Sequence, residues 1–250
     1  MMNKLEVAAL DKNMIISLLP HCIFFVGAII SGSKALAVLP IPIVVCVWSL
    51  CPACIFLLDY SATPSVDIGL VTVTAGILSL GTAVSVVLLD IRLPFAESGY
   101  SYLLAYVVFV TAQVLQSRIT NPRHTEVDKL YYSNMFSVVV LAPSSFYLEE
   151  AFSVLQFQHR RQLRFYLGCL MSGILGVLLQ LWAARSRPHK WFCRTQCMAR
   201  LLSCLLSGPL FGTADVKSTV WLFATINLVS TAYIPPESDF IVKNNEALVV

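Results

Sequence analysis

The sequence predicts an all-α polytopic membrane protein with about eight transmembrane helices. Hydrophobic residues make up 57% of the 250 residues and charged residues only 12%, whereas a soluble domain has roughly 25% charged residues. The mean hydropathy is correspondingly high, at +0.76. The charged residues also divide the chain into apolar windows, and about 20 residues in a helix cross the hydrocarbon core of a bilayer. Because lipid replaces water as the solvent, charges are kept out of these windows.

Eight windows are the predicted spans, and they are helices because unpaired backbone groups in lipid cost several kcal/mol each. The window at 201–214 is shorter than the others and spans the bilayer if it starts near Thr195 and Arg200 faces protein or water. Residues 13–236 are therefore expected to form the bundle, between an N-terminal segment at 1–12 and a tail at 237–250. The other seven windows each lie between charged residues: 13–33, 35–58, 68–89, 98–117, 130–148, 165–184 and 218–236.

Loop charges predict that both termini are cytosolic, because the side richer in Lys and Arg usually stays in the cytosol. An even number of spans agrees with this orientation. The other side of the membrane receives six basic residues, Lys34, Arg92, Arg160, Arg161, Arg164 and Lys217. The side with the termini carries eleven: Lys4, Lys12, Arg118, Arg123, Lys129, Arg185, Arg187, Lys190, Arg194, Arg200 and Lys243.

Several function classes lack their sequence signals. The 17 basic residues form no stripe with interleaved aromatics, so the sequence does not favour nucleic-acid binding. The four histidines are scattered without the spacing of a helical metal site. No glycine-rich phosphate loop is present, so transport would be driven by exchange or a gradient rather than by ATP. We expect no metal and no cofactor, and we do not expect an enzyme.

The motif Cys51-Pro52-Ala53-Cys54 has the spacing of a redox-active dithiol. It lies in an apolar window, without a βαβ pattern and without a second cysteine pair that could relay electrons. A proline-kinked helix with small packing residues is the favoured interpretation. A membrane thiol oxidoreductase that uses Cys51 and Cys54 remains the third function under consideration.

Polar residues in apolar windows are costly unless a water-filled cavity receives them. Tyr131, Tyr132, Ser133 and Asn134 cluster at the start of the fifth span. Aromatic rings stack on bases, and an Asn amide offers both a donor and an acceptor. The alternative is a belt of interfacial tyrosines, which spacing alone favours.

Arg200 is the second polar candidate, because it lies in or beside an apolar helix and does not lose its charge. A guanidinium binds phosphate oxygens in a bidentate fork, which suits a diphosphate. The alternative is that Arg200 snorkels to the cytosolic headgroups.

Two segments resemble nucleotide-sugar transporters of the GDP-mannose transporter branch: residues 31–36 (Ser-Gly-Ser-Lys-Ala-Leu) and 39–43 (Leu-Pro-Ile-Pro-Ile). With residues 25–30, 134–140 and 152–155, the chain is similar to the drug/metabolite transporter superfamily from about residue 18 to about residue 166. The resemblance implies a ten-helix antiporter of two inverted repeats, with its site near the midplane of the membrane. Such an antiporter exchanges a cytosolic nucleotide sugar for a luminal nucleoside monophosphate across the Golgi membrane, with the endoplasmic reticulum as the alternative location.

The resemblance also implies site residues. Related transporters recognise the base with a Phe-Tyr-Asn-Asn motif, and Tyr131, Tyr132 and Asn134 fall where that motif is expected, with Ser133 as a departure. A Gly-Ala-Leu-Asn-Lys motif that contacts the sugar phosphate has its counterpart near residues 196–200, where only the terminal charge of Arg200 is kept. Lys34, the basic residue of the matched segment 31–36, completes the substrate-binding candidates.

The resemblance begins at the family's third helix, so we expect an incomplete version of the ten-helix fold. A homodimer or a partner transporter could cover the polar faces left by two absent helices. Our leading hypothesis is a nucleotide-sugar antiporter, with UDP-N-acetylglucosamine as the first substrate to try. The alternative is a non-transporting membrane protein that stabilises or regulates a partner transporter.

Overall fold

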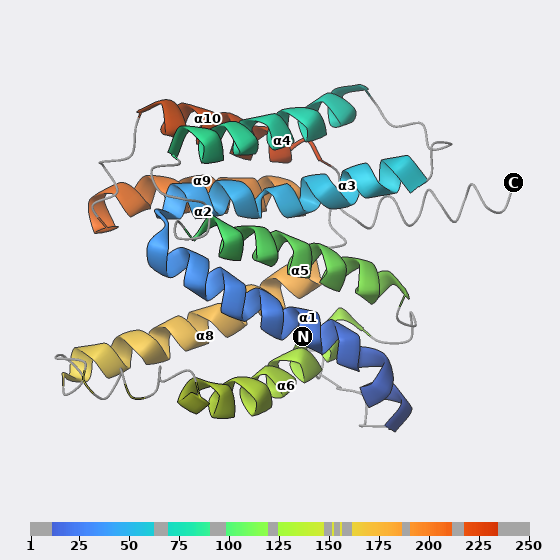
Figure 1. Cartoon of the computed structure of the whole chain (residues 1–250), viewed down its shortest axis with the longest axis vertical. Coiled ribbons are helices and arrows are strands. Elements are labelled where there is room, and N and C mark those ends of the chain that lie inside the picture. Colours follow the sequence, from blue (N-terminus) through green and yellow to red (C-terminus); the bar gives the residue numbers. More distant parts are fainter. Residues whose placement is uncertain are drawn as a thin grey trace, which may run out of the picture. The chain divides into compact units, whose positions relative to one another are not determined.

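The structure is a computed structural model. It describes residues 12–62, 70–90, 99–119, 125–147, 152, 156, 162–186, 191–211 and 218–234. The predicted terminal segments therefore lie outside the described residues, except for Lys12, and so do residues 153–155 of the matched segment. Within the described ranges the chain forms nine helices (Figure 1): α1 (Lys12–Val38), α2 (Ile41–Trp48), α3 (Leu50–Ala62), α4 (Leu70–Asp90), α5 (Tyr100–Ile119), α6 (Glu126–Tyr147), α8 (Leu163–Ser186), α9 (Phe192–Phe211) and α10 (Ser218–Thr231).

The helices confirm an all-α polytopic membrane protein. Each of the eight predicted windows contains a helix, and α2 and α3 share the second window. The short seventh window belongs to α9, whose 20 residues begin three residues before Thr195. In the described part of the chain, four segments are long and apolar enough to cross a membrane: Ile15–Val38, Ile41–Leu58, Leu70–Leu89 and Leu163–Ser186. The total of about eight spans remains a prediction.

The boundary expected at Lys34, between the first two windows, is wrong. Helix α1 continues through Lys34 to Val38, and the Leu39 N–H still bonds the Ala35 carbonyl oxygen at 2.9 Å. The chain then turns at Pro40, which is extended (φ −60°, ψ 141°) and precedes α2. Proline disfavours helical geometry in the residue before it, whereas a lysine stem can lie along an apolar surface with its charge at the rim. Proline, and not charge, ends this helix.

A second proline accounts for the break between α2 and α3. Pro52 lies in the first turn of α3, and the carbonyl four residues before it belongs to Trp48, the last residue of α2. Proline has no N–H to bond that carbonyl, and its ring clashes with it. Ser49, at the break, is fully buried. The interruption agrees with the proline kink predicted at the Cys51–Cys54 motif.

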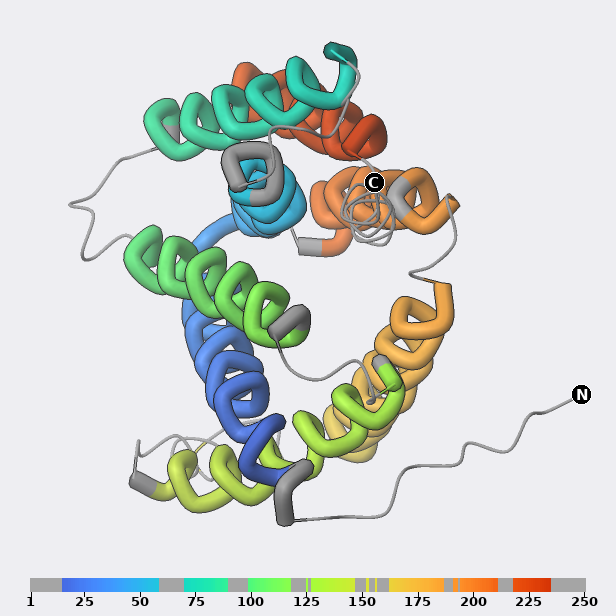
Figure 2. The backbone as a smooth tube through the Cα atoms, turned by 90° about the vertical axis from the view of Figure 1, so that its right-hand side faces the viewer, coloured from blue at the N-terminus to red at the C-terminus, as the bar shows by residue number. Residues whose placement is uncertain are grey.

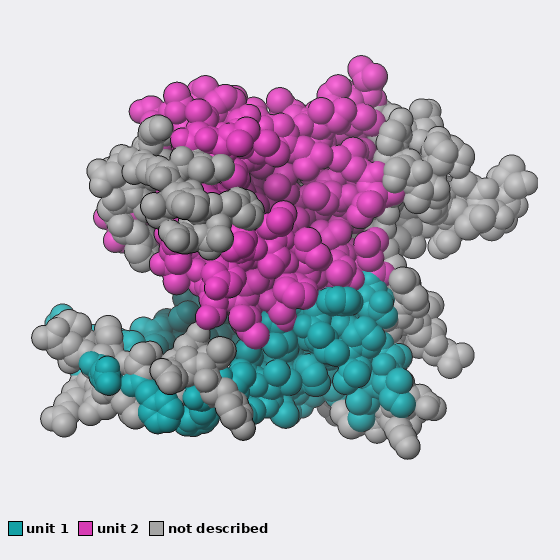
Figure 3. All heavy atoms as spheres, viewed as in Figure 1, with its two compact units in different colours: residues 1–26, 116–186 teal, residues 27–115, 187–250 magenta. Residues whose placement is uncertain are grey.

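The described helices belong to two compact units, shown in Figure 3. Unit 1 comprises residues 1–26 and 116–186, and in it α6 packs against α8. Unit 2 comprises residues 27–115 and 187–250. Within unit 2, α2 contacts α4, α9 and α10. Helices α4 and α10 lie side by side in both backbone views (Figures 1 and 2).

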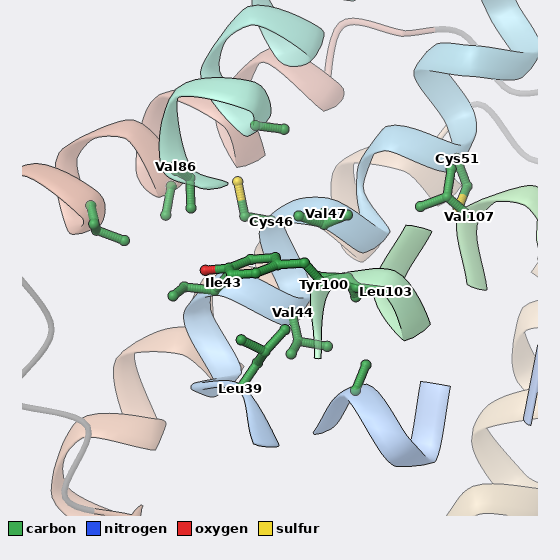
Figure 4. Packing of buried hydrophobic residues seen from close by; sticks show 14 residues of the cluster. Leu39, Ile43, Val44, Cys46, Val47, Cys51, Val86, Tyr100, Leu103 and Val107 are labelled. Atoms are coloured by element: carbon green, nitrogen blue, oxygen red, sulfur yellow. The ribbon is translucent and has the colours of Figure 1, made fainter. Parts of the chain in front are cut away.

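The largest apolar cluster lies in unit 2 and is centred on α2 (Figure 4). Ile43, Val44 and Cys46 are completely buried in it. Leu39 and Tyr100 extend the cluster toward the end of α1 and the start of α5. Helix α2 is therefore the element of unit 2 around which the neighbouring helices are positioned.

Candidate functional site

The start of α6, which carries the predicted base-binding cluster, is held by a capping box. The Asp128 N–H donates to the Thr125 hydroxyl oxygen at 3.2 Å, and the Asp128 carboxylate accepts from the Thr125 N–H at 3.2 Å and from its O–H at 2.7 Å. This reciprocal arrangement satisfies donors that the first helical turn leaves unpaired. The neighbouring Lys129 donates to the Ser117 hydroxyl at 2.7 Å. The end of α5 thus anchors α6 just before the cluster.

The cluster itself is divided between two faces of α6. Tyr132 packs against Leu18 and Cys22 of α1, and the buried Ser133 hydroxyl lies 3.7 Å from the Cys22 sulfur. Tyr131, in contrast, is 47% exposed and meets the Tyr132 ring edge-on, with centroids 5.4 Å apart. Asn134 follows Tyr131 by three residues, which places the two on neighbouring positions of one helix face. Tyr131 is thus exposed, Tyr132 and Asn134 are half-buried, and Ser133 is buried.

The Asn134 amide has a defined orientation. Its nitrogen donates to the Leu130 carbonyl oxygen at 2.8 Å and to the Gln180 side-chain oxygen of α8 at 3.2 Å. Both amide hydrogens are therefore used, because an Asn side chain carries two. Among the described residues, no hydrogen bond is made by its oxygen. Asn134 thus presents a hydrogen-bond acceptor.

Arg200 lies on the side of α9 that faces the interior of unit 2. Cys197 and Cys204, one helical turn away on either side, are buried, and the Cys197 thiol donates to the Leu228 carbonyl oxygen at 2.9 Å. Arg200 donates to the Gln196 side-chain oxygen at 3.4 Å. Arg200 itself is half-buried, and its role remains a prediction.

An aromatic pair also lies in unit 2. The Trp48 and Tyr106 rings stack with centroids 5.1 Å apart and an interplanar angle of 29°. Tyr106 packs directly on Gly32, where an added Cβ would lie 2.9 Å from the ring. The Trp48 indole nitrogen is buried and has no partner in the described ranges. Sequence reasoning missed this pair, because an aromatic residue in an apolar window looks the same whether it packs or lines a site.

The predicted site residues belong to both units. Tyr131, Tyr132 and Asn134 lie in unit 1, whereas Arg200 and the partly exposed Lys34 lie in unit 2. The convergence of these residues on one cavity remains a prediction. Sequence reasoning also missed Gln180, whose only signal was a polar residue inside an apolar window.

The cysteine motif has the setting of a packing element. Cys51 is buried and Cys54 partly buried, and both are free thiols. Within the described ranges, no group of three or more His, Cys, Asp or Glu residues could hold a metal ion. The structure thus places the motif in the interior of unit 2, beside the break after α2.

Fold and site together describe a polytopic helical membrane protein with polar groups inside its apolar helices, an arrangement typical of transporters. The sequence matches no protein-family model. A Xenopus laevis protein named UDP-N-acetylglucosamine transporter TMEM241 homolog is 29% identical over 193 residues, which is 74% of this chain and 62% of the frog protein. The Mus musculus protein named UDP-N-acetylglucosamine transporter TMEM241 is 27% identical over 230 residues, 87% of this chain and 74% of the mouse protein.

These homologues confirm the resemblance found in the sequence, because they match most of the chain and carry one name. Neither name describes an enzyme, in agreement with the expectation of a non-enzymatic protein. The chain spans about three-fifths of the length of the frog relative.

Proposed function

We propose that this protein is a nucleotide-sugar transporter that exchanges a UDP-sugar, with UDP-N-acetylglucosamine favoured, for a nucleoside monophosphate. The observation that carries the proposal is its homology to two proteins named as UDP-N-acetylglucosamine transporters. The polar side chains inside its apolar helices support it, because lipid-spanning proteins keep such groups mainly along substrate pathways.

The proposed roles follow from the chemistry of each side chain. The exposed Tyr131 ring stacks on the base, and the Asn134 oxygen accepts a hydrogen bond from the base edge. Tyr132, which packs against α1, holds this part of α6 in place. Arg200 binds the diphosphate through its guanidinium fork, and Lys34 contributes a second positive charge.

We place the protein in the Golgi membrane with both termini cytosolic, and the endoplasmic reticulum is the alternative. The support is the excess of Lys and Arg on the loops that share a side with the termini. Tags at the N- and C-termini should therefore be accessible to antibody once only the plasma membrane is permeabilised. A tag that appears only after the internal membrane is opened would contradict this orientation.

The transport test is exchange in proteoliposomes that hold the full chain and are preloaded with UMP. Radiolabelled UDP and GDP sugars are then offered as a panel, with empty liposomes as the control. We expect uptake of at least one UDP-sugar that depends on internal UMP. Absence of uptake for the whole panel, with folded protein confirmed, would contradict the proposal.

The alternative function is a non-transporting protein that stabilises or regulates a partner transporter. Helix α8 favours it, because none of its side chains is buried in the described structure. Such a surface would be covered by lipid, by a second copy of the chain or by a partner. Co-purification of a transporter, combined with no exchange by the chain itself, would support this alternative.

A further inference from the structure

The contact between Asn134 and Gln180 joins two polar side chains from different helices of unit 1. Asn134 lies on α6 and Gln180 on α8, and the Asn134 nitrogen donates to the Gln180 side-chain oxygen at 3.2 Å. Asn134 is half-buried and Gln180 exposed, so a ligand could reach this pair. Polar side chains in apolar helices cost free energy unless they are hydrogen-bonded in a network or serve a function.

The orientation of both amides follows from one backbone group. The Leu130 carbonyl oxygen cannot donate, so the Asn134 group that lies 2.8 Å from it is the NH₂. The second hydrogen of this NH₂ points to Gln180, and therefore Gln180 presents its oxygen. If the Gln180 amide were rotated by 180°, its NH₂ group would face the NH₂ group of Asn134, and neither could accept a hydrogen bond. The pair consequently leaves the Asn134 oxygen as an acceptor and the Gln180 nitrogen as a donor.

We propose that Gln180 is a specificity-determining residue that reads the base of the nucleotide together with Asn134. This inference rests on the proposed function, because it assigns a further residue to the same site. The acceptor of Asn134 and the donor of Gln180 complement a base edge on which an N–H lies beside a carbonyl oxygen. Uracil has this edge, with N3–H between two carbonyl oxygens, and guanine has it as well, at N1–H and O6, so the wild-type pair matches both bases.

The assignment predicts how to shift the selectivity of the site from uracil toward guanine. In a Gln180→Glu variant one carboxylate oxygen still accepts from Asn134, while the other replaces the donor with an acceptor. The pair then presents two acceptors. Guanine offers two adjacent donors, N1–H and its 2-amino group, whereas the single N–H of uracil would leave a carbonyl oxygen facing the carboxylate. An unmatched polar group of this kind is strongly disfavoured in a binding site.

The experiment measures binding of UMP and GMP to the purified full chain through the thermal stabilisation that each nucleotide produces. Gln156→Glu is the matched control, because it makes the same change at an exposed residue outside α6 and α8. We expect the ratio of UMP to GMP affinity to fall about tenfold or more in Gln180→Glu and to stay unchanged in Gln156→Glu. Both nucleotides carry the same phosphate, so any repulsion between it and the new carboxylate cancels in the ratio of the two affinities.

A second variant, Gln180→Met, keeps the side-chain length but removes both the donor and the acceptor. We expect weaker UMP binding without a gain for GMP. Unchanged ratios in Gln180→Glu, or wild-type UMP affinity in Gln180→Met, would overturn the role of Gln180 and leave the transporter proposal standing. If the wild-type chain binds neither nucleotide, the proposed function fails and this inference fails with it.

Discussion

The side-chain amide of Asn227 donates a hydrogen bond to the Ser79 carbonyl oxygen at 2.6 Å and so joins α10 to α4. The same nitrogen lies 3.1 Å from the Thr82 hydroxyl, and the amide oxygen accepts from the Ser49 hydroxyl. Asn227 is completely buried. One side chain of α10 therefore connects α4 with the break between α2 and α3, and it satisfies polar groups that lipid could not.

We predict that Asn227→Leu destabilises the protein by about 1–3 kcal/mol, because buried polar groups lose their partners. The melting temperature in detergent measures the effect, with the loss of folded protein on heating detected by size-exclusion chromatography. Thr225→Val is the matched control on α10. Among the described residues, the exposed Thr225 hydroxyl bonds within its own helix, to the Leu222 carbonyl oxygen at 2.8 Å. Equal melting temperatures for the two variants would show that the buried network contributes little.

Gly32→Val is expected to displace the Tyr106 ring. The first added carbon would lie 2.9 Å from the ring, and overpacking of this kind costs about 1–3 kcal/mol. The Trp48–Tyr106 stack should loosen, which a change in tryptophan emission and a lower melting temperature would report. Gly81→Ala serves as the control, because in the described structure no atom lies within 4 Å of its new Cβ. If Gly32→Val changed neither the tryptophan emission nor the melting temperature, Tyr106 would not pack on Gly32 in the folded protein.

Removal of the Arg200 charge by Arg200→Gln should weaken nucleotide binding about tenfold to a hundredfold, because a charge-assisted bond contributes about 1.5–3 kcal/mol. Arg200→Lys should recover part of the affinity, since it keeps the charge but loses the fork. Arg194, an exposed residue of α9, provides the control variant Arg194→Gln. Its guanidinium carbon lies 5.9 Å from the centroid of the Trp191 ring. Wild-type affinity in Arg200→Gln would favour the snorkelling interpretation.

The cysteine motif should be dispensable. The double variant Cys51→Ala with Cys54→Ala keeps small side chains in the interior, so we expect exchange near that of the wild type. Maleimide labelling in detergent provides a direct comparison: exposed Cys169 on α8 should react quickly and buried Cys51 slowly. A measurable electron-transfer activity that disappears in the double variant would instead revive the thiol oxidoreductase.

The helices could be predicted from the sequence because their causes are local. Exclusion of charge from lipid defined the windows, and each window contains a helix. The error at Lys34 is also local in origin, because we treated a charge as a boundary where the helix runs on to Val38. Tyr131, Asn134 and Arg200 were found because polar residues are conspicuous in apolar windows. Their roles and their convergence remain predictions.

Partners of the polar groups were decided only by the tertiary structure. Asn227 bonds Ser79 from 148 residues away, and nothing in the sequence pairs Asn134 with Gln180 or Tyr106 with Gly32. The physical reason is the solvent. In water, an apolar stripe shows which helix face is buried, but lipid tails are as apolar as a protein interior, so a membrane helix is hydrophobic all round. Composition thus determined that these segments are helices in a membrane, and packing alone decided which faces meet.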